Sequence, residues 1–237
     1  MSGNMGEHSE RAKTERERAL RIKLRDDFGF YAPRALAVLG KPNERGVREL
    51  VPFRFNEAQQ IIHARIEEQR ARTGMVRALI LKGRQQGAST YVEGRNYWRT
   101  TQRRGQRTMI LTHVQDATDN LFAMVDRYHV NAPPFVRPQV GASNAKELVF
   151  PALDSRFQVS TAGARGVGRS ATLTNFHGSE VAFWPNAADH LSGALQAVPY
   201  AAGTEVILES TAQGIGNTFH QQWVQAEGGA SDSLNAA

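Results

Sequence analysis

Short apolar runs alternate with longer amphipathic segments along most of this chain. The runs at residues 76–81, 108–112 and 205–208 have the length and composition of buried strands, and the segments at 91–103 and 115–128 have helical character. Strands that alternate with helices pair in parallel through helical crossovers. The pattern therefore predicts an α/β fold, with a mostly parallel central sheet and helices on both faces.

The chain ends differ from the middle in composition. Residues 1–27 are rich in Glu and Arg and poor in large apolar side chains, which predicts a charged, partly flexible extension. Residues 28–228 form the expected globular domain, and residues 229–237 a disordered tail. Further elements are expected within the domain: a helix from residue 57 capped by Asn56, strands or a hairpin at 147–150 and 156–160, a strand at 171–176, a helix at 187–198, and a last helix opened by residues 214–217.

Composition narrows the class of protein. The 237 residues suit one large α/β domain or one domain with an appendage, and the absence of cysteine excludes disulfides and a thiolate nucleophile. No secretory signal and no apolar run of membrane-spanning length is present. The net charge of +6 favours a polyanion such as nucleic acid, although many basic proteins bind none.

A Gly-rich loop follows the strand at 76–81. Gly83, Gly87 and Ser89 fit the phosphate-binding pattern G-x-x-x-x-G-K-[ST], in which backbone N–H groups and a helix N-terminus cradle phosphates. Ala88 stands where the pattern has lysine. The loop predicts a nucleotide site or, alternatively, a simple turn between a strand and a helix.

Two cations flank this loop. Lys82 and Arg84 could bring positive charge to the phosphates from the other side. Ser89 takes the position that holds Mg²⁺ in such loops.

A second segment with candidate catalytic residues follows the strand expected at 171–176. It has the layout of a Walker B strand in which the Asp-Glu pair is changed to Ser179-Glu180. Glu180 would activate or orient the attacking water, and Ser179 could hold the metal through a bound water. A surface carboxylate after a strand is the simpler alternative. His177 either orients Glu180 or is a structural histidine.

The strand at 205–208 ends in Glu209, Ser210 and Thr211. In motor ATPases a Ser or Thr at this place can sense the γ-phosphate; otherwise the segment is only a strand that meets a turn. Residues 163–170 also spell G-x-x-x-x-G-R-S, but they lie directly before a strand and leave no room for a helix. We interpret them as a basic loop or a Gly-rich turn. Arg165 or Arg169 could serve there as an arginine finger or a DNA contact.

Four segments in this order, 56–59, 82–90, 177–184 and 209–212, resemble the ATPase domain of the large terminases of tailed bacteriophages. The resemblance extends from residue 28 to about residue 225. It implies a three-layer P-loop NTPase of the ASCE type that hydrolyses ATP with Mg²⁺ and moves double-stranded DNA into a procapsid. It also implies a small terminase subunit and a portal protein as partners, a homo-oligomeric ring that is a monomer when isolated, and the host-cell cytoplasm, with no membrane.

The resemblance also implies roles for individual residues. Glu180 is catalytic together with Arg84, Gln59 contacts adenine, and Glu209, Ser210 and Thr211 couple hydrolysis to movement. Ala88 and Ser179 depart from the family pattern. The sequence ends before the family's nuclease domain, so no DNA cleavage is expected. A helicase-like ATPase and a binding module without turnover remain alternatives. The expected nucleotide-binding residues are Gln59, Lys82, Gly83, Arg84, Gln85, Gln86, Gly87, Ala88, Ser89 and Thr90.

Overall fold

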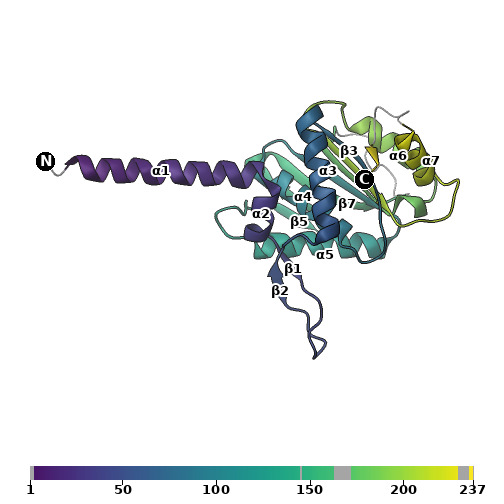
Figure 1. Cartoon of the computed structure of the whole chain (residues 1–237), viewed down its shortest axis with the longest axis horizontal. Helices are drawn as coiled ribbons and strands as arrows, with labels where there is room; N and C mark the ends of the chain where they lie inside the picture. The colour runs from purple at the N-terminus through teal and green to yellow at the C-terminus, as the bar shows by residue number, and fades with distance from the viewer. Residues whose placement is uncertain (1–2, 145, 163–171, 229–234, 237) are drawn as a thin grey trace.

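The computed structural model describes residues 3–144, 146–162, 172–228 and 235–236. Its helices surround a central sheet (Figure 1). Helix α3 has clear sequence-encoded signals at both of its ends. Asn56 and Gln59 form a reciprocal capping box before α3, and Gly74 ends that helix in the left-handed conformation. The helices are α1 (Gly3–Asp26), α2 (Phe28–Ala35), α3 (Glu57–Thr73), α4 (Ala88–Gln102), α5 (Gln115–Asn131), α6 (Ala187–Ala197) and α7 (Thr218–Glu227), with short 3₁₀ turns η1 (Pro151–Leu153) and η2 (Val181–Phe183).

In the described residues, the main sheet has eight strands in the order β10-β3-β9-β8-β4-β7-β6-β5. Six of them, from β10 to β7, pair in parallel, and β6 pairs antiparallel with both of its neighbours. The predicted α/β class with a mostly parallel sheet is confirmed. The strands are β3 (Val76–Leu81), β4 (Arg107–Thr112), β5 (Ala142–Asn144), β6 (Glu147–Phe150), β7 (Ser155–Thr161), β8 (Asn175–Ser179), β9 (Glu205–Ser210) and β10 (Asn235–Ala236).

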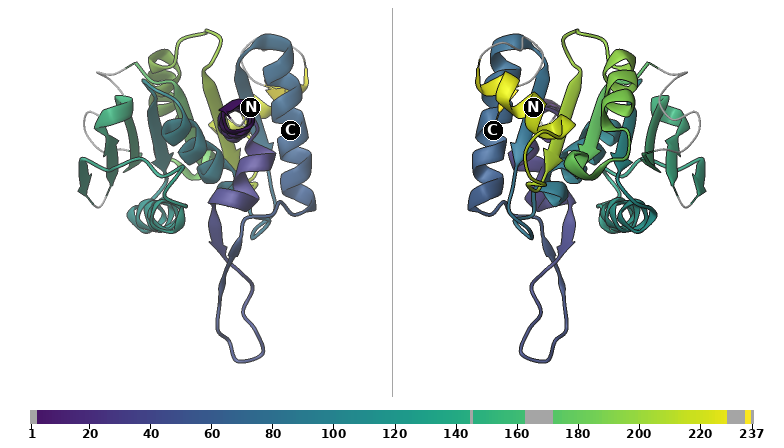
Figure 2. Two further views of the ribbon diagram at one scale, coloured as in Figure 1. Left: turned by 90° about the vertical axis from the view of Figure 1, so that its left-hand side faces the viewer. Right: turned by 90° about the vertical axis from the view of Figure 1, so that its right-hand side faces the viewer.

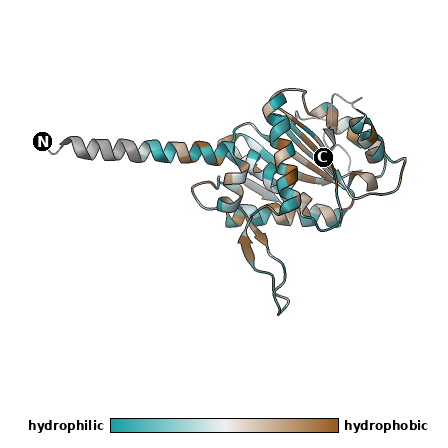
Figure 3. Ribbon diagram, in the orientation of Figure 1, coloured by the Kyte–Doolittle hydropathy of each residue, from teal (hydrophilic) through white to brown (hydrophobic). Residues whose placement is uncertain are grey.

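The two faces of the sheet bury separate cores. Residues of β3 alternate between them: Ala78 and Ile80 pack with α2 to α5, and Leu79 packs with α6 and α7. Each face is thus covered by helices, which gives three layers, and the hydrophobic colouring of Figure 3 concentrates on the sheet between them. The carboxyl ends of the parallel strands lie along one edge, where ligands gather in folds of this kind.

Two appendages leave this body. Helix α1 projects from it (Figure 1), although its last turn is anchored because Leu24 is buried and its carbonyl accepts a hydrogen bond from Trp98 Nε1 at 2.8 Å. Strands β1 (Ala37–Leu39) and β2 (Leu50–Pro52) form an antiparallel hairpin that extends below the domain (Figure 2). No helix in the described part of the chain is long and apolar enough to cross a membrane.

The structure corrects one element and refines others. The strand expected at 171–176 is wrong: β8 covers Asn175–Ser179, because the buried run His177-Gly178-Ser179 pairs with β9 and β4 although its side chains are largely polar. Helix α4 begins at Ala88, within the Gly-rich loop motif. Asn235 and Ala236, in the expected tail, pair with β3.

Candidate functional site

Three neighbouring parallel strands bring the predicted motifs together. Strand β9 lies between β3 and β8, with Leu81 opposite Ser210 and Ser179 opposite Glu209. The segments after these strands therefore meet at one point of the sheet edge, although the first of them lies far from the other two in the sequence. The chain connectivity alone does not give this order of strands.

The Gly-rich loop joins β3 to α4 and is held from α3. Gln59 Nε2 donates to the Gly87 carbonyl at 2.8 Å, and Asn56 Nδ2 donates to the Gln86 carbonyl at 3.1 Å. Gly87 has φ of +78°, and a Cβ there would lie 2.6 Å from Gln59 Nε2, so both conformation and space require glycine. Gln59 is buried and its Oε1 also accepts from the Asn56 N–H. In this structure Gln59 thus positions the loop, and its contact with adenine stays a prediction.

Lys82 lies at the centre of the cluster. Its ammonium is 2.5 Å from Glu209 Oε2, 3.0 Å from Glu180 Oε1 and 3.2 Å from Ser89 Oγ. These three partners come from β9, from the turn after β8 and from the start of α4. One cation therefore ties together the loop and the segments after β8 and β9 that the sequence singled out.

Glu180 follows β8 in the left-handed conformation, with φ of +54°. Its Oε2 accepts hydrogen bonds from the Thr211 N–H at 3.0 Å and the Thr211 hydroxyl at 3.1 Å. Non-glycine residues in this conformation are strained and concentrate at functional sites. Gln85 of the loop, with φ of +61°, is another of the four such residues in the described ranges.

Glu209 is fully buried and is bonded more extensively than the sequence suggested. Its Oε1 accepts from the Ser89 hydroxyl at 2.9 Å and from the Ser179 hydroxyl at 2.8 Å. His177 Nε2 is 3.6 Å from the same oxygen, and His177 Nδ1 is 2.6 Å from Glu93 Oε1 on α4. A row of buried charged groups thus runs from α4 through the sheet to the loop.

Burial and neighbouring charges set the protonation of this row. Burial raises the pKa of Glu209, but His177 and Lys82 outweigh it and lower that pKa to about 2. Burial lowers the pKa of His177, but Glu209 and Glu93 raise it to about 9. Burial likewise lowers the pKa of Lys82, and Glu209 and Glu180 together leave it above its ordinary value. At neutral pH Lys82 and His177 are cations that face an ionised Glu209.

The sequence left the role of His177 open between a partner of Glu180 and a structural histidine, and it missed Glu93. His177 lies inside β8 with Glu93 and Glu209 as its partners, rather than beside Glu180. Glu93 gave no signal, because a glutamate in a helix is usually exposed. Glu209 was expected only in the coupling segment; its position at the end of the apolar run 206–208 was the signal that it is buried.

The remaining predicted residues divide by position. Arg84, Gln85 and Gln86 are exposed on the loop, while Ala88 is buried at the start of α4. Thr90 accepts a hydrogen bond at its carbonyl from the Tyr128 hydroxyl at 3.1 Å. Arg165 and Arg169 lie outside the described residues, so their roles stay predictions.

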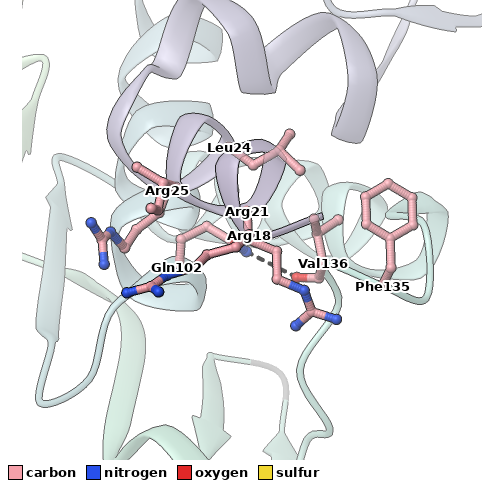
Figure 4. A pocket seen from close by; sticks show the side chains of 8 residues that line it. Arg18, Arg21, Leu24, Arg25, Gln102, Phe135 and Val136 are labelled. Atoms are coloured by element: carbon pink, nitrogen blue, oxygen red, sulfur yellow. Dashed lines mark hydrogen bonds between the residues drawn. The ribbon is translucent and has the colours of Figure 1, made fainter. Parts of the chain in front are cut away.

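A hollow lies at the base of α1 (Figure 4). This cavity of about 250 Å³ is lined in part by Leu24 and Val136, and Gln102 beside it donates to the Val136 carbonyl at 2.9 Å. Three arginines of α1 also line it: Arg18, Arg21 and Arg25. Spacing of three and four residues places these arginines on one side of the helix.

Solved structures of bacteriophage large terminases have a similar fold. The large terminase of bacteriophage HK97 superposes with a TM-score of 0.70 at 12% identity, over 90% of this chain and 43% of the terminase. The ATPase domain of the large terminase of Thermus phage P74-26 gives a TM-score of 0.56 at 17% identity, over 83% of this chain and 85% of that domain. This chain therefore spans less than half the length of the HK97 protein.

The large terminase of a thermophilic bacteriophage, solved in complex with ADP, gives a TM-score of 0.55 at 12% identity over 77% of this chain and 44% of that one. No protein-family model matches the sequence, and the search of curated proteins finds no match. The chain has the fold of a large terminase ATPase domain, which confirms the structural side of the predicted resemblance.

Proposed function

We propose that this chain is the ATP-hydrolysing motor domain of a viral large terminase, which drives double-stranded DNA into a procapsid. The observation that carries the proposal is the meeting of Lys82, Ser89 and Glu180 at the carboxyl end of β3, with Lys82 Nζ 3.0 Å from Glu180 Oε1. A phosphate-binding loop, a hydroxyl for Mg²⁺ and a carboxylate for water are what phosphoryl transfer requires.

Each part of the site has a role in this proposal. The backbone N–H groups of residues 83–88 and the N-terminus of α4 bind the phosphates, and Lys82 and Arg84 supply the positive charge that Ala88 cannot. Mg²⁺ would be held by Ser89 and, through water, by Ser179; bound there, it would neutralise charge on the phosphates. Glu180 orients the attacking water.

Thr211 would couple hydrolysis to movement. Both its N–H and its hydroxyl bond Glu180 Oε2, so a change at Glu180 is passed directly to the segment after β9. That segment continues into an exposed loop in which Ile215 is 88% exposed. Ser210 donates to the Thr211 carbonyl at 2.9 Å and thereby stiffens the same turn.

DNA and assembly partners belong to the proposal as well. The net charge of +6 and the three arginines around the hollow at α1 suit contact with a phosphate backbone. Arg165 or Arg169 would act as finger or DNA contact. A homo-oligomeric ring, a small terminase subunit, a portal protein and a location in the host-cell cytoplasm follow from the terminase role.

The test is Mg²⁺-dependent ATP hydrolysis at high protein concentration, with and without double-stranded DNA. Because a positioned base contributes about 10²- to 10⁴-fold, Glu180→Ala should lower the rate by that factor while ATP binding persists. Lys82→Ala and Arg84→Ala should weaken ATP binding. Glu227→Ala, an exposed change on α7, serves as the control.

Two results would overturn the proposal. Unchanged hydrolysis in Glu180→Ala would remove this residue from catalysis and favour an unrelated contaminating activity. ATP binding without turnover under any condition, with or without DNA, would favour the binding module over the motor.

A further inference from the structure

Strand β8 lacks the carboxylate that the motif has at its end, and a glutamate on the neighbouring strand β9 can take its place. At residue 179, where the motif has an Asp, the chain has Ser179, and the residue opposite it on β9 is Glu209. Adjacent strands are about 4.8 Å apart, so a glutamate on β9 reaches the place that an aspartate on β8 would occupy. The Ser179 hydroxyl indeed donates to Glu209 Oε1 at 2.8 Å.

The same oxygen, Glu209 Oε1, also contacts the residue that follows the Gly-rich loop. Glu209 Oε1 accepts from the Ser89 hydroxyl at 2.9 Å, so it lies between the two hydroxyls to which the proposed function assigns the metal. Two hydroxyls and an ionised carboxylate are hard oxygen donors of the kind that Mg²⁺ prefers. The donor set therefore fits the cation.

A cation already occupies this oxygen-rich position. The Lys82 ammonium has oxygens of Glu209, Glu180 and Ser89 within 3.2 Å. Two buried or half-buried carboxylates cannot be left without positive charge, so an ammonium that moves toward phosphates must be replaced. A divalent cation that arrives with the nucleotide supplies that charge and releases Lys82.

We propose that Glu209 is the carboxylate that holds the nucleotide's Mg²⁺, and that the Lys82 ammonium and the metal occupy the same position in turn. Glu209 thus joins Ser89 and Ser179 in the metal site, and the acidic residue is displaced by one strand from its usual place. His177 and Glu93 are positioning residues behind it. The inference rests on the proposed binding of ATP.

The experiment measures Mn²⁺ as a probe of the Mg²⁺ site, from the electron paramagnetic resonance of free Mn²⁺ titrated with protein and ADP. Loss of an outer partner of a metal ligand already weakens affinity about 10- to 100-fold. Glu209→Gln should therefore weaken Mn²⁺ binding at least about tenfold. The amide oxygen still accepts from both serine hydroxyls, so folding, checked by circular dichroism, should be retained.

A rescue separates a metal role from a structural one. In Glu209→Gln, the added change Ser179→Asp returns a carboxylate to β8 and should restore most of the Mn²⁺ affinity. A structural role of Glu209 predicts no rescue. Glu227→Gln should leave Mn²⁺ binding unchanged.

Binding of a fluorescent ADP in EDTA distinguishes this inference from the proposed function. If wild type binds ADP and the Mn²⁺ affinity of Glu209→Gln equals that of wild type, the inference alone is overturned. Wild type that binds ADP neither in EDTA nor with Mn²⁺ overturns both proposals. ADP binding in EDTA that is equal in wild type and Glu209→Gln, with Mn²⁺ affinity lost only in the variant, supports the inference.

Discussion

Strand β9 carries two buried glutamates, four residues apart and on the same face of the sheet. Glu205, at the start of the strand, binds Arg95 through both carboxylate oxygens, at 2.7 and 2.9 Å, and binds Arg99 at 2.8 Å. Glu209, at the end, binds two serine hydroxyls and a lysine. Charged neighbours outweigh burial and lower both pKa values to about 2.

Burial and pKa therefore do not distinguish Glu205 from Glu209; the chemistry of their partners does. Guanidinium forks on α4 hold Glu205 in two directions at once, and they cannot lose their protons. Hydroxyls and an ammonium on a flexible stem can exchange Glu209 for another partner. The start of β9 is thus held by guanidinium groups, and our proposals place the ligand-dependent change at its other end.

The largest expected effect is a loss of stability when Glu205, at the start of β9, is replaced. Glu205→Ala leaves Arg99 buried without a carboxylate and leaves Arg95 with Glu67 alone, at 2.6 Å, so we expect the free energy of unfolding to fall by about 3–5 kcal/mol. Glu209→Gln should lose clearly less, because its hydroxyl donors keep an acceptor. Urea unfolding followed by circular dichroism measures both. Equal losses would show that the two ends are alike.

The next expected effect is a loss of stability at high pH, which should arise at the Glu209 end of β9 and not at the Glu205 end. His177 has its pKa raised to about 9 in the folded chain from an ordinary 6.5, so its stabilising contribution is complete below pH 6.5 and is lost as pH rises through 9. Arg95 and Arg99, which bind Glu205 at the other end of β9, do not titrate between pH 6.5 and 9. We expect the free energy of unfolding to fall by roughly 2 kcal/mol between pH 6.5 and 9.

The control for this pH effect is His177→Gln, in which the fall between pH 6.5 and 9 should largely vanish. A fall of the same size in that variant would assign the effect to other groups. The measurement is urea unfolding repeated at half-unit steps of pH.

The smallest expected effect is a difference in stability and ADP binding between two glycine variants, one of which lies in the Gly-rich loop between β3 and α4. Gly87→Ala and Gly105→Ala both place alanine at positive φ, at +78° and +67°, which costs about 1–2 kcal/mol. A Cβ at Gly105 meets nothing within 4 Å, whereas at Gly87 it meets Gln59 Nε2. We expect Gly87→Ala to lose about 1 kcal/mol more in thermal or urea unfolding, because overpacking adds to the strain, and to bind ADP more weakly.

Gly105→Ala should leave ADP binding unchanged. If the two variants lose equal stability and bind ADP equally, the contact between α3 and the loop does not constrain the site.

Much of the fold could be predicted because local patterns encode it. The apolar run of β3, the Asn56 cap of α3 and the Gly-rich entry to α4 are each local, and the structure has all three. The misplaced strand shows the limit. His177 and Ser179 are polar, yet they are buried because Glu93 and Glu209 provide hydrogen-bond partners from other elements.

The sequence by itself determined which residues are candidates for chemistry: Lys82, Ser89, Glu180 and the segment that begins at Glu209 stand where strands end. Only the tertiary structure decided how they combine. Strand β9 is the last of these three strands in the chain but lies between β3 and β8, and that insertion brings the carboxylate of Glu209 between Ser89 and Ser179. The physical reason is that strand order is a long-range choice, made by packing both faces of the sheet, and no local pattern records it.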